Sequence, residues 1–361
     1  MTRRLLCGGW GFVLLLALGG CPLPPVDDGL PLLDLEPNDT FDTAVVLTLD
    51  DGGTRQFRGT ISTTSDTDLY RLNSINPGDR LIVDVRQRDS QLDAVLIVFD
   101  AAGNMQAFND DRAIDGSDVN PFLDFVVRGQ QGAYFVGITA FQGGRTSGGY
   151  EVGVQVIRGD GPAGAAPAVV YLNWLGGLLD SLSLGTTTLP PFSATQVGLS
   201  AADTTPLKQR VEAIVRGRYA EYNITIASSD SGPRPTAPHS TVFFGGDNSR
   251  AFALAEQIDV MNTDPHDVAI IYTEPFRTAF GRQLTLDEMA TAMGNTVAHE
   301  IGHLLGLVHT RDCLELMDAT CSNSALLLDQ RFGRARLDSA VFPIGWQDAV
   351  DWLTRLLGWS T

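Results

Sequence analysis

The sequence predicts a multidomain fold: an N-terminal antiparallel β-sandwich, then an α+β domain with a twisted sheet, a long central helix and a C-terminal helix. Residues 36–157 contain short alternating apolar runs separated by turn residues, which is typical of a sandwich. Residues 158–167 are rich in Gly, Ala and Pro and form a linker. In residues 168–361 strand-like apolar runs alternate with amphipathic helical periods. The 361 residues, 43% of them hydrophobic, suffice for two cores.

The N-terminus has the pattern of an export signal. Residues 1–20 combine two arginines near the start with a short apolar stretch, Phe12–Leu18, and small residues before Cys21. Leu18-Gly19-Gly20-Cys21 resembles the lipobox of bacterial lipoproteins, which implies cleavage before Cys21 and acylation of that cysteine. The alternative is an ordinary secreted protein in which Cys21 is a spare thiol. We expect an exported, lipid-anchored chain at the bacterial cell envelope or surface, with residues 21–35 as a tether.

The charge of the chain argues against nucleic acid as a partner. The formal net charge is −18, and Lys208 is the only lysine. Binding a phosphate backbone requires clustered basic side chains, which this composition does not provide. We therefore expect no nucleic acid, and contact with a membrane through the lipid anchor only.

The first domain is predicted to consist of a series of short β-strands. Turn signals such as Pro77-Gly78-Asp79 and Ala102-Gly103-Asn104 separate the apolar runs. The runs expected to form strands include 56–61, 81–85, 94–99, 122–127, 134–139 and 150–156.

Several motifs in this segment resemble the bacterial pre-peptidase C-terminal domain, a small β-sandwich attached to secreted proteases. They are Glu36-Pro37-Asn38-Asp39-Thr40, Ser65-Asp66-Thr67-Asp68-Leu69-Tyr70, Phe108-Asn109-Asp110-Asp111 and Gly149-Tyr150-Glu151-Val152. The family usually follows the protease domain, whereas here the segment comes first. The resemblance implies substrate adhesion or assistance in secretion. The carboxylates of Asp66, Asp68, Asp110 and Asp111 are candidate calcium ligands, or alternatively turn and capping residues.

The second domain is expected to alternate strands and helices. A helix is predicted over 206–222, with Thr205 as its N-cap and Pro206 at its first position. Strands are predicted at 169–174, 224–227, 241–244 and 268–273, and a C-terminal helix at 346–357, ended by Gly358.

Three of the five histidines lie in one motif, His299-Glu300-Ile301-Gly302-His303-Leu304-Leu305-Gly306-Leu307-Val308-His309, which fits H-E-x-x-H-x-x-G-x-x-H. The preceding residues predict a helix, because Thr285 and Glu288 form a capping box. His299 and His303 are one helical turn apart, so both imidazoles project from one face. Gly306 can adopt the left-handed conformation that ends a helix, which lets the chain turn back and bring His309 to the same ion.

This ligand set predicts a catalytic zinc site. Three neutral imidazoles leave one coordination position for water, whose pKa zinc lowers to roughly 7. Glu300, next to the first ligand, is the candidate general base for attack on a peptide carbonyl. An extended peptide would pair with an edge strand of the sheet, for which residues 241–246 are the candidate.

The eleven-residue motif is the signature of the metzincin metallopeptidases, and residues 168–361 resemble a compact metzincin domain. Met317, eight residues after His309, resembles the Met-turn of the matrixin group, in which a methionine lies beneath the metal. Ala319 stands where some metzincins have a tyrosine ligand, so no such ligand is expected here.

Cys313 and Cys321 flank Met317 in a chain expected to be exported. In an oxidising compartment a disulfide is expected between them and would contribute roughly 2 to 3 kcal/mol; two reduced thiols are the alternative.

Two functions remain open from the sequence. The first is a monomeric zinc endopeptidase that acts on a protein or peptide substrate, either active or shielded by the N-terminal domain. The second is a surface adhesion or binding protein with a structural or inactive zinc site. The presence of Glu300 favours the first, because a structural site needs no general base.

Overall fold

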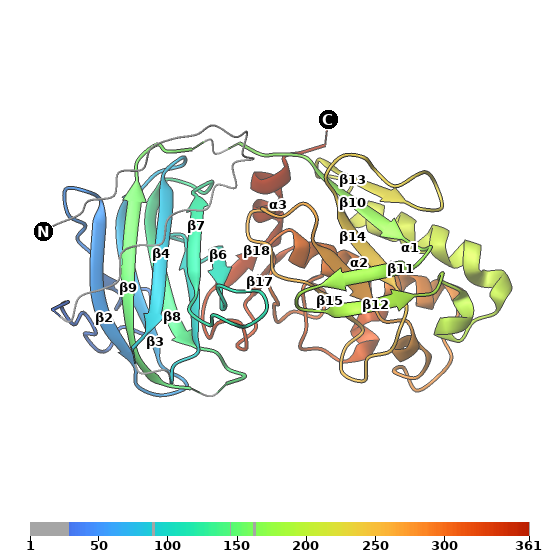
Figure 1. Cartoon of the computed structure of the whole chain (residues 1–361), viewed down its shortest axis with the longest axis horizontal. Helices are drawn as coiled ribbons and strands as arrows, with labels where there is room; N and C mark the ends of the chain where they lie inside the picture. Colours follow the sequence, from blue (N-terminus) through green and yellow to red (C-terminus); the bar gives the residue numbers. More distant parts are fainter. Residues whose placement is uncertain (1–28, 89–90, 145, 162–163, 361) are drawn as a thin grey trace, which may run out of the picture.

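A computed structural model describes residues 29–88, 91–144, 146–161 and 164–360 of the chain. Figure 1 shows a β-rich multidomain protein, with the sandwich on the left and a mixed α and β domain on the right. The expected signal peptide and Cys21 lie outside the described residues. None of the helices in the described part combines the length and apolarity needed to cross a bilayer.

The N-terminal domain consists of two facing sheets. One has the strand order β1-β3-β8-β5-β6 and the other β2-β9-β4-β7, with antiparallel pairing throughout except for the short parallel pair β1 and β3. Alternate residues of both sheets fill the core, as expected for a sandwich. The strands are β1 (Val45–Val46), β2 (Thr54–Ile61), β3 (Thr67–Ile75), β4 (Arg80–Gln87), β5 (Ala94–Phe99), β6 (Met105–Asn109), β7 (Phe122–Val126), β8 (Gly132–Ala140) and β9 (Gly148–Ile157).

The C-terminal domain contains a five-stranded sheet with the order β13-β10-β14-β16-β15. Four strands are parallel, and the short edge strand β15 runs antiparallel to β16. Its strands are β10 (Ala168–Asn173), β13 (Ile224–Ser228), β14 (Ser240–Phe244), β15 (Ala253–Ala255) and β16 (Val268–Ile271). Two hairpins lie outside this sheet, β11 (Gly177–Ser181) with β12 (Gly185–Leu189) and β17 (Arg334–Arg336) with β18 (Trp346–Asp348).

Three α-helices complete this domain: α1 (Thr204–Arg218), α2 (Leu286–Leu304) and α3 (Ala349–Leu357). Helix α2 packs against α1 and the sheet, and the side chains over most of its length are buried. The expected capping box is present, because Glu288 N–H donates to Thr285 and the Glu288 carboxylate accepts from Thr285 N–H. Single 3₁₀ turns are η1 (Ala194–Val197), η2 (Ala201–Asp203), η3 (Glu274–Arg277) and η4 (Asn323–Leu327).

Two helices have boundaries that differ from the sequence prediction. Helix α1 begins at Thr204 with Asp203 as its N-cap, so Thr205 is not the cap, and it ends at Arg218 rather than at residue 222. The last helix begins at Ala349, because Trp346–Asp348 forms β18 instead. Pairing of Trp346 with β17 and with Gly103 of the sandwich outweighs the helical period there.

The two domains share a tight joint. The last strand and helix of the chain contact the hairpin between β5 and β6: Trp346 N–H donates to Gly103 O at 2.9 Å, and Arg355 donates to Gln106 Oε1 at 2.8 Å. The rings of Phe99 and Phe342 lie edge to face at 5.5 Å between centroids. Figure 1 shows β17, β18 and α3 between the two bodies. This packing fixes the position of the sandwich against the second domain.

Asp267, at the start of β16, gives the domain a predicted pH dependence. It is 1% exposed and neither carboxylate oxygen has a hydrogen-bond partner among the described residues. Burial, with added repulsion from Asp259, Asp264 and Glu256, raises its pKa from 3.8 to about 8, although the nearby Ser240 hydroxyl opposes the rise. Between pH 4 and pH 8 the folded chain therefore keeps a proton that the unfolded chain releases, so stability falls as pH rises.

We expect Asp267→Asn to remove this loss. The Tm of the variant minus the Tm of the natural protein should be larger at pH 8 than at pH 4. Thermal unfolding of both proteins across that pH range measures this difference. An equal Tm difference at both pH values would contradict the assignment.

Candidate metal centre

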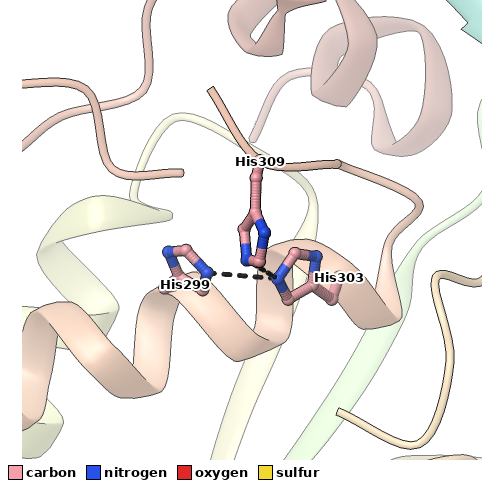
Figure 2. Close-up of side chains that lie close together, drawn as sticks. All are labelled: His299, His303 and His309. Carbon is pink, nitrogen blue, oxygen red and sulfur yellow. Dashed lines mark hydrogen bonds between the residues drawn. The ribbon is translucent and has the colours of Figure 1, made fainter. Parts of the chain in front are cut away.

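Helix α2 and the loop after it bring three imidazoles together. His299 and His303 project from adjacent turns of α2, and His309 approaches from the returning chain (Figure 2). The Nε2 atom of His303 lies 3.1 Å from Nε2 of His299 and 3.1 Å from Nε2 of His309. The described residues contain no other cluster of three histidines.

The hydrogen bonds on the far side of two rings fix how they are protonated. His299 Nδ1 lies 2.9 Å from Leu316 O, and His303 Nδ1 lies 2.7 Å from Leu307 O. A carbonyl oxygen only accepts, so both Nδ1 atoms carry the hydrogen and both Nε2 atoms present lone pairs. Lone pairs 3.1 Å apart repel each other unless a cation lies between them. The donor set therefore fits a metal ion such as zinc.

Burial keeps the three imidazoles neutral, which is the form that binds metal. It lowers the pKa of His299 to about 3 and that of His309 to about 4. The pKa of His303 is held well below its usual range by burial and by the two neighbouring rings.

Gly306 ends the helix as the sequence motif predicts. Its φ of +86° is in the left-handed region that favours glycine. Gly306 N–H donates to His303 O, and Leu307 N–H donates to Gly302 O, both at 2.9 Å. This pair of bonds is the Schellman pattern, which reverses the chain and brings His309 back over the helix.

Two side chains from the end of the chain hold this loop, and the sequence interpretation missed both. Gln347 accepts from Val308 N–H at 2.8 Å and donates to Val308 O at 2.9 Å. Trp352 Nε1 donates to Leu305 O at 2.7 Å. No local pattern of the sequence indicates either contact, because the partners lie 39 and 47 positions apart along the chain.

Met317 is fully buried and packs against Gly302 of helix α2. A Cβ added to Gly302 would lie 2.5 Å from Met317 Sδ, so the small residue at this motif position makes room for the methionine. Glu315, also missed, holds this turn: its carboxylate accepts from Thr310 Oγ1 at 2.6 Å and from Met317 N–H at 2.8 Å. Burial raises the pKa of Glu315 to about 7.

Cys313 and Cys321 are joined by a disulfide bond across the same segment. The bridge spans a sequence separation of 8 residues and encloses Met317. Ala319, two residues after Met317, lines the cavity without offering a ligand atom.

A cavity of about 670 Å³ opens over the imidazoles. Glu300 borders it beside His299, is 5% exposed, and has its pKa raised to about 8 by burial, with an opposing interaction from the Ala255 backbone. Strand β15 lines the cavity, and so do residues 108–112 and Ile114 of the sandwich. The buried Glu300 carboxyl group and the three imidazoles thus line one cavity.

The edge strand is β15, and the prediction of residues 241–246 was wrong. Strand β14 (Ser240–Phe244) lies between β10 and β16 and is therefore internal. Phe252 O accepts from Tyr272 N–H, and Glu256 N–H donates to Val268 O, so residues 252, 254 and 256 face β16. By alternation, the backbone groups of Ala253 and Ala255 point away from the sheet.

The structure separates the four candidate calcium ligands. Asp66 and Asp68 lie near other acidic residues: Asp34, Glu36 and Asp68 form one group, and Glu36, Asp39 and Asp66 another, with ligand atoms within 4.8 Å in each. Asp110 and Asp111 line the cavity over the histidines instead. The four residues therefore do not form one site.

No family model matches the chain, and no curated protein matches it. Solved structures give weak likenesses. A zinc-dependent peptidase from Methanocorpusculum labreanum aligns with 45% of this chain and 93% of its own at 15% identity, with a TM-score of 0.26. The pre-peptidase C-terminal domain of a Bacillus anthracis collagenase aligns with 31% of this chain and 94% of its own at 16% identity, with a TM-score of 0.24.

A further likeness is to PliG of Aeromonas hydrophila, a periplasmic inhibitor of g-type lysozyme. It aligns with 31% of this chain and 95% of its own at 16% identity, with a TM-score of 0.26.

Proposed function

We propose that the chain is an exported zinc endopeptidase of the metzincin type, anchored to the bacterial envelope through Cys21. The observation that carries this proposal is the convergence of three neutral imidazole nitrogens beside the buried Glu300 at the base of an open cavity. A purely structural zinc site is closed by four protein ligands, whereas only three protein ligands converge here among the described residues.

The residues of the site have separate tasks. When bound, zinc supplies Lewis-acid chemistry that acidifies a nearby water and polarises a carbonyl oxygen. His299, His303 and His309 would hold the ion, with two of them oriented by the Leu316 and Leu307 carbonyls. Glu300 takes a proton from the attacking water and later delivers it to the leaving amine.

Strand β15 gives the substrate its orientation. The outward N–H and C=O groups of Ala253 and the C=O of Ala255 can pair with an extended peptide laid along the cavity, while the Ala255 N–H interacts with Glu300. Such pairing recognises the main chain and leaves side-chain selection to the remaining walls. The arrangement suits an enzyme that cuts within chains.

Chelation tests the proposal. The purified protein should cleave casein or gelatin, should lose that activity in excess chelator, and should regain it when zinc is restored, as followed by gel electrophoresis. If the zinc-loaded protein leaves a broad set of unfolded proteins intact, the alternative of an envelope adhesion protein with a non-catalytic zinc site is favoured.

We also propose that calcium binds between the two acidic groups at the start of the sandwich. Asn38 lies among them with 0% exposure, and its Oδ1 has no hydrogen-bond partner among the described residues. Burial raises the pKa of Asp68 to about 8, and Asp34 and Asp66 add to the rise. A hard cation with many oxygen ligands would give the Asn38 oxygen a partner and would stabilise the negative charge of the clustered carboxylates.

Millimolar calcium should therefore raise the Tm of the protein by about 3 °C or more in differential scanning fluorimetry. Asp68→Asn should reduce the shift, and Asp42→Asn, an exposed carboxylate of the same segment, should leave it unchanged. Equal shifts with calcium and magnesium, or in all three proteins, would contradict a specific site.

A further inference from the structure

Part of the lining of the cavity belongs to the sandwich. Residues 108–112 and Ile114, from the end of β6 and the loop that leads to β7, line the same space as His299, Glu300 and His309. Phe99, Gly103 and Gln106, which contact the second domain, lie only a few residues before this loop. Because the joint fixes the base of the loop, the loop has a defined place beside the site.

Two carboxylates on this wall have no counter-charge. Among the described residues, Asp110 and Asp111 form no ion pair. The Asp110 carboxylate accepts only from the neighbouring Asp111 N–H, at 3.0 Å. Burial raises the pKa of Asp111 to about 6, and Asp110, Asp93 and Asp118 add to the rise. The anion at Asp111 would therefore be stabilised by a positive charge placed next to it.

The arginines of the cavity do not provide that charge. Arg112 is paired with the buried Asp84 and lies 5.0 Å from the ring centroid of Phe122. Arg250 is exposed at the rim, next to β15, and makes no ion pair among the described residues. The wall formed by the loop is therefore acidic toward the space above the imidazoles.

We propose that this loop of the sandwich is one wall of the substrate cleft, and that Asp110 and Asp111 select peptides with a lysine or arginine side chain near the scissile bond. The inference rests on the proposed peptidase function and adds the substrate class to it. An extended peptide paired with β15 directs alternate side chains to opposite sides, so one set points toward the loop. The sandwich then acts as a part of the enzyme that determines specificity.

Binding of matched peptides tests this inference apart from catalysis. The probe is a fluorescein-labelled peptide that the natural protein cuts at one bond, prepared with arginine or with its neutral analogue citrulline at each of three positions on either side. Affinity is measured by fluorescence anisotropy with the zinc-loaded Glu300→Gln variant. At one position or more, the arginine peptide should bind about threefold to tenfold more tightly at low salt, and the difference should shrink as salt is added.

A second pair of variants assigns the preference to the loop. Replacing both carboxylates, Asp110→Asn with Asp111→Asn, in the Glu300→Gln background should abolish the difference between the two peptides. Asp115→Asn should preserve it, since Asp115 is on the same loop but is exposed and does not line the cavity. In proteins that retain Glu300, kcat/KM for the arginine peptide should fall in the double variant while that for the citrulline peptide stays constant.

Two outcomes would overturn the inference. One is equal affinity for both peptides at every position, and the other is an arginine preference that survives in the double variant. Either result leaves the peptidase proposal standing, because the probe is a peptide already shown to be cut. Failure of the zinc-loaded protein to cut any peptide would instead contradict the peptidase proposal itself.

Discussion

Glu300→Gln should lower kcat/KM for peptide hydrolysis by roughly 10²- to 10⁴-fold, the range associated with loss of a general acid and base. Glutamine has the same shape but cannot take a proton from water, so the metal ligands should keep their positions. Zinc content, measured by elemental analysis, should remain one ion per chain. The Tm should not fall, because the substitution removes a buried ionisable group whose pKa burial raises to about 8.

The control is Glu274→Gln, which replaces an exposed glutamate paired with Arg277 outside the cavity. It should retain full activity and zinc. Equal activity of Glu300→Gln and the natural protein would show that another group transfers the proton.

Gly306→Ala should destabilise the protein and weaken zinc binding together. An alanine at φ +86° costs about 1 to 2 kcal/mol. Its Cβ would also lie 2.8 Å from the Trp352 ring and 3.0 Å from Asp259 O, which adds about 1 to 3 kcal/mol of overpacking. We expect a fall in Tm of roughly 5 to 10 °C. Because the loop must shift to relieve the contact, His309 moves relative to the other two imidazoles, and zinc should dissociate at a lower chelator concentration.

Gly281→Ala is the matched control. Gly281 also has a positive φ, +67°, but a Cβ there would meet nothing within 4 Å. It should show only the backbone cost and normal zinc affinity. If the two variants behaved alike, the close packing around Gly306 would not be what holds the third imidazole.

The convergence of the three histidines was largely predictable because its determinants are local. Helical periodicity places His299 and His303 on one face, the Thr285 and Glu288 pair starts the helix, and Gly306 ends it. Each of these depends on residues within a turn or two of each other. Six strands of the sandwich were likewise predicted from short apolar runs between turn residues, whereas β3 and β6 were not named.

What the sequence could not predict depends on distant parts of the chain. The edge strand β15 is Ala-Leu-Ala, three residues without β-branching, so nothing in its composition distinguishes it from a loop. Trp346–Asp348 has a helical pattern, yet pairs with β17 and with Gly103, more than 200 residues earlier. The placement of Asp110 and Asp111 over the imidazoles likewise depends on how two domains meet, which no local period encodes.

The contacts of Gln347 and Trp352 with the histidine loop have a consequence for biosynthesis. These side chains lie within the last fifteen residues, and they hold the chain on both sides of Gly306. The loop that carries His309 therefore depends on side chains 39 and 47 positions farther along the chain, so it is held in place only after β18 and α3 have been synthesised and packed. For the peptidase that we propose, a folding intermediate without β18 and α3 would hold His309 less firmly than the folded protein.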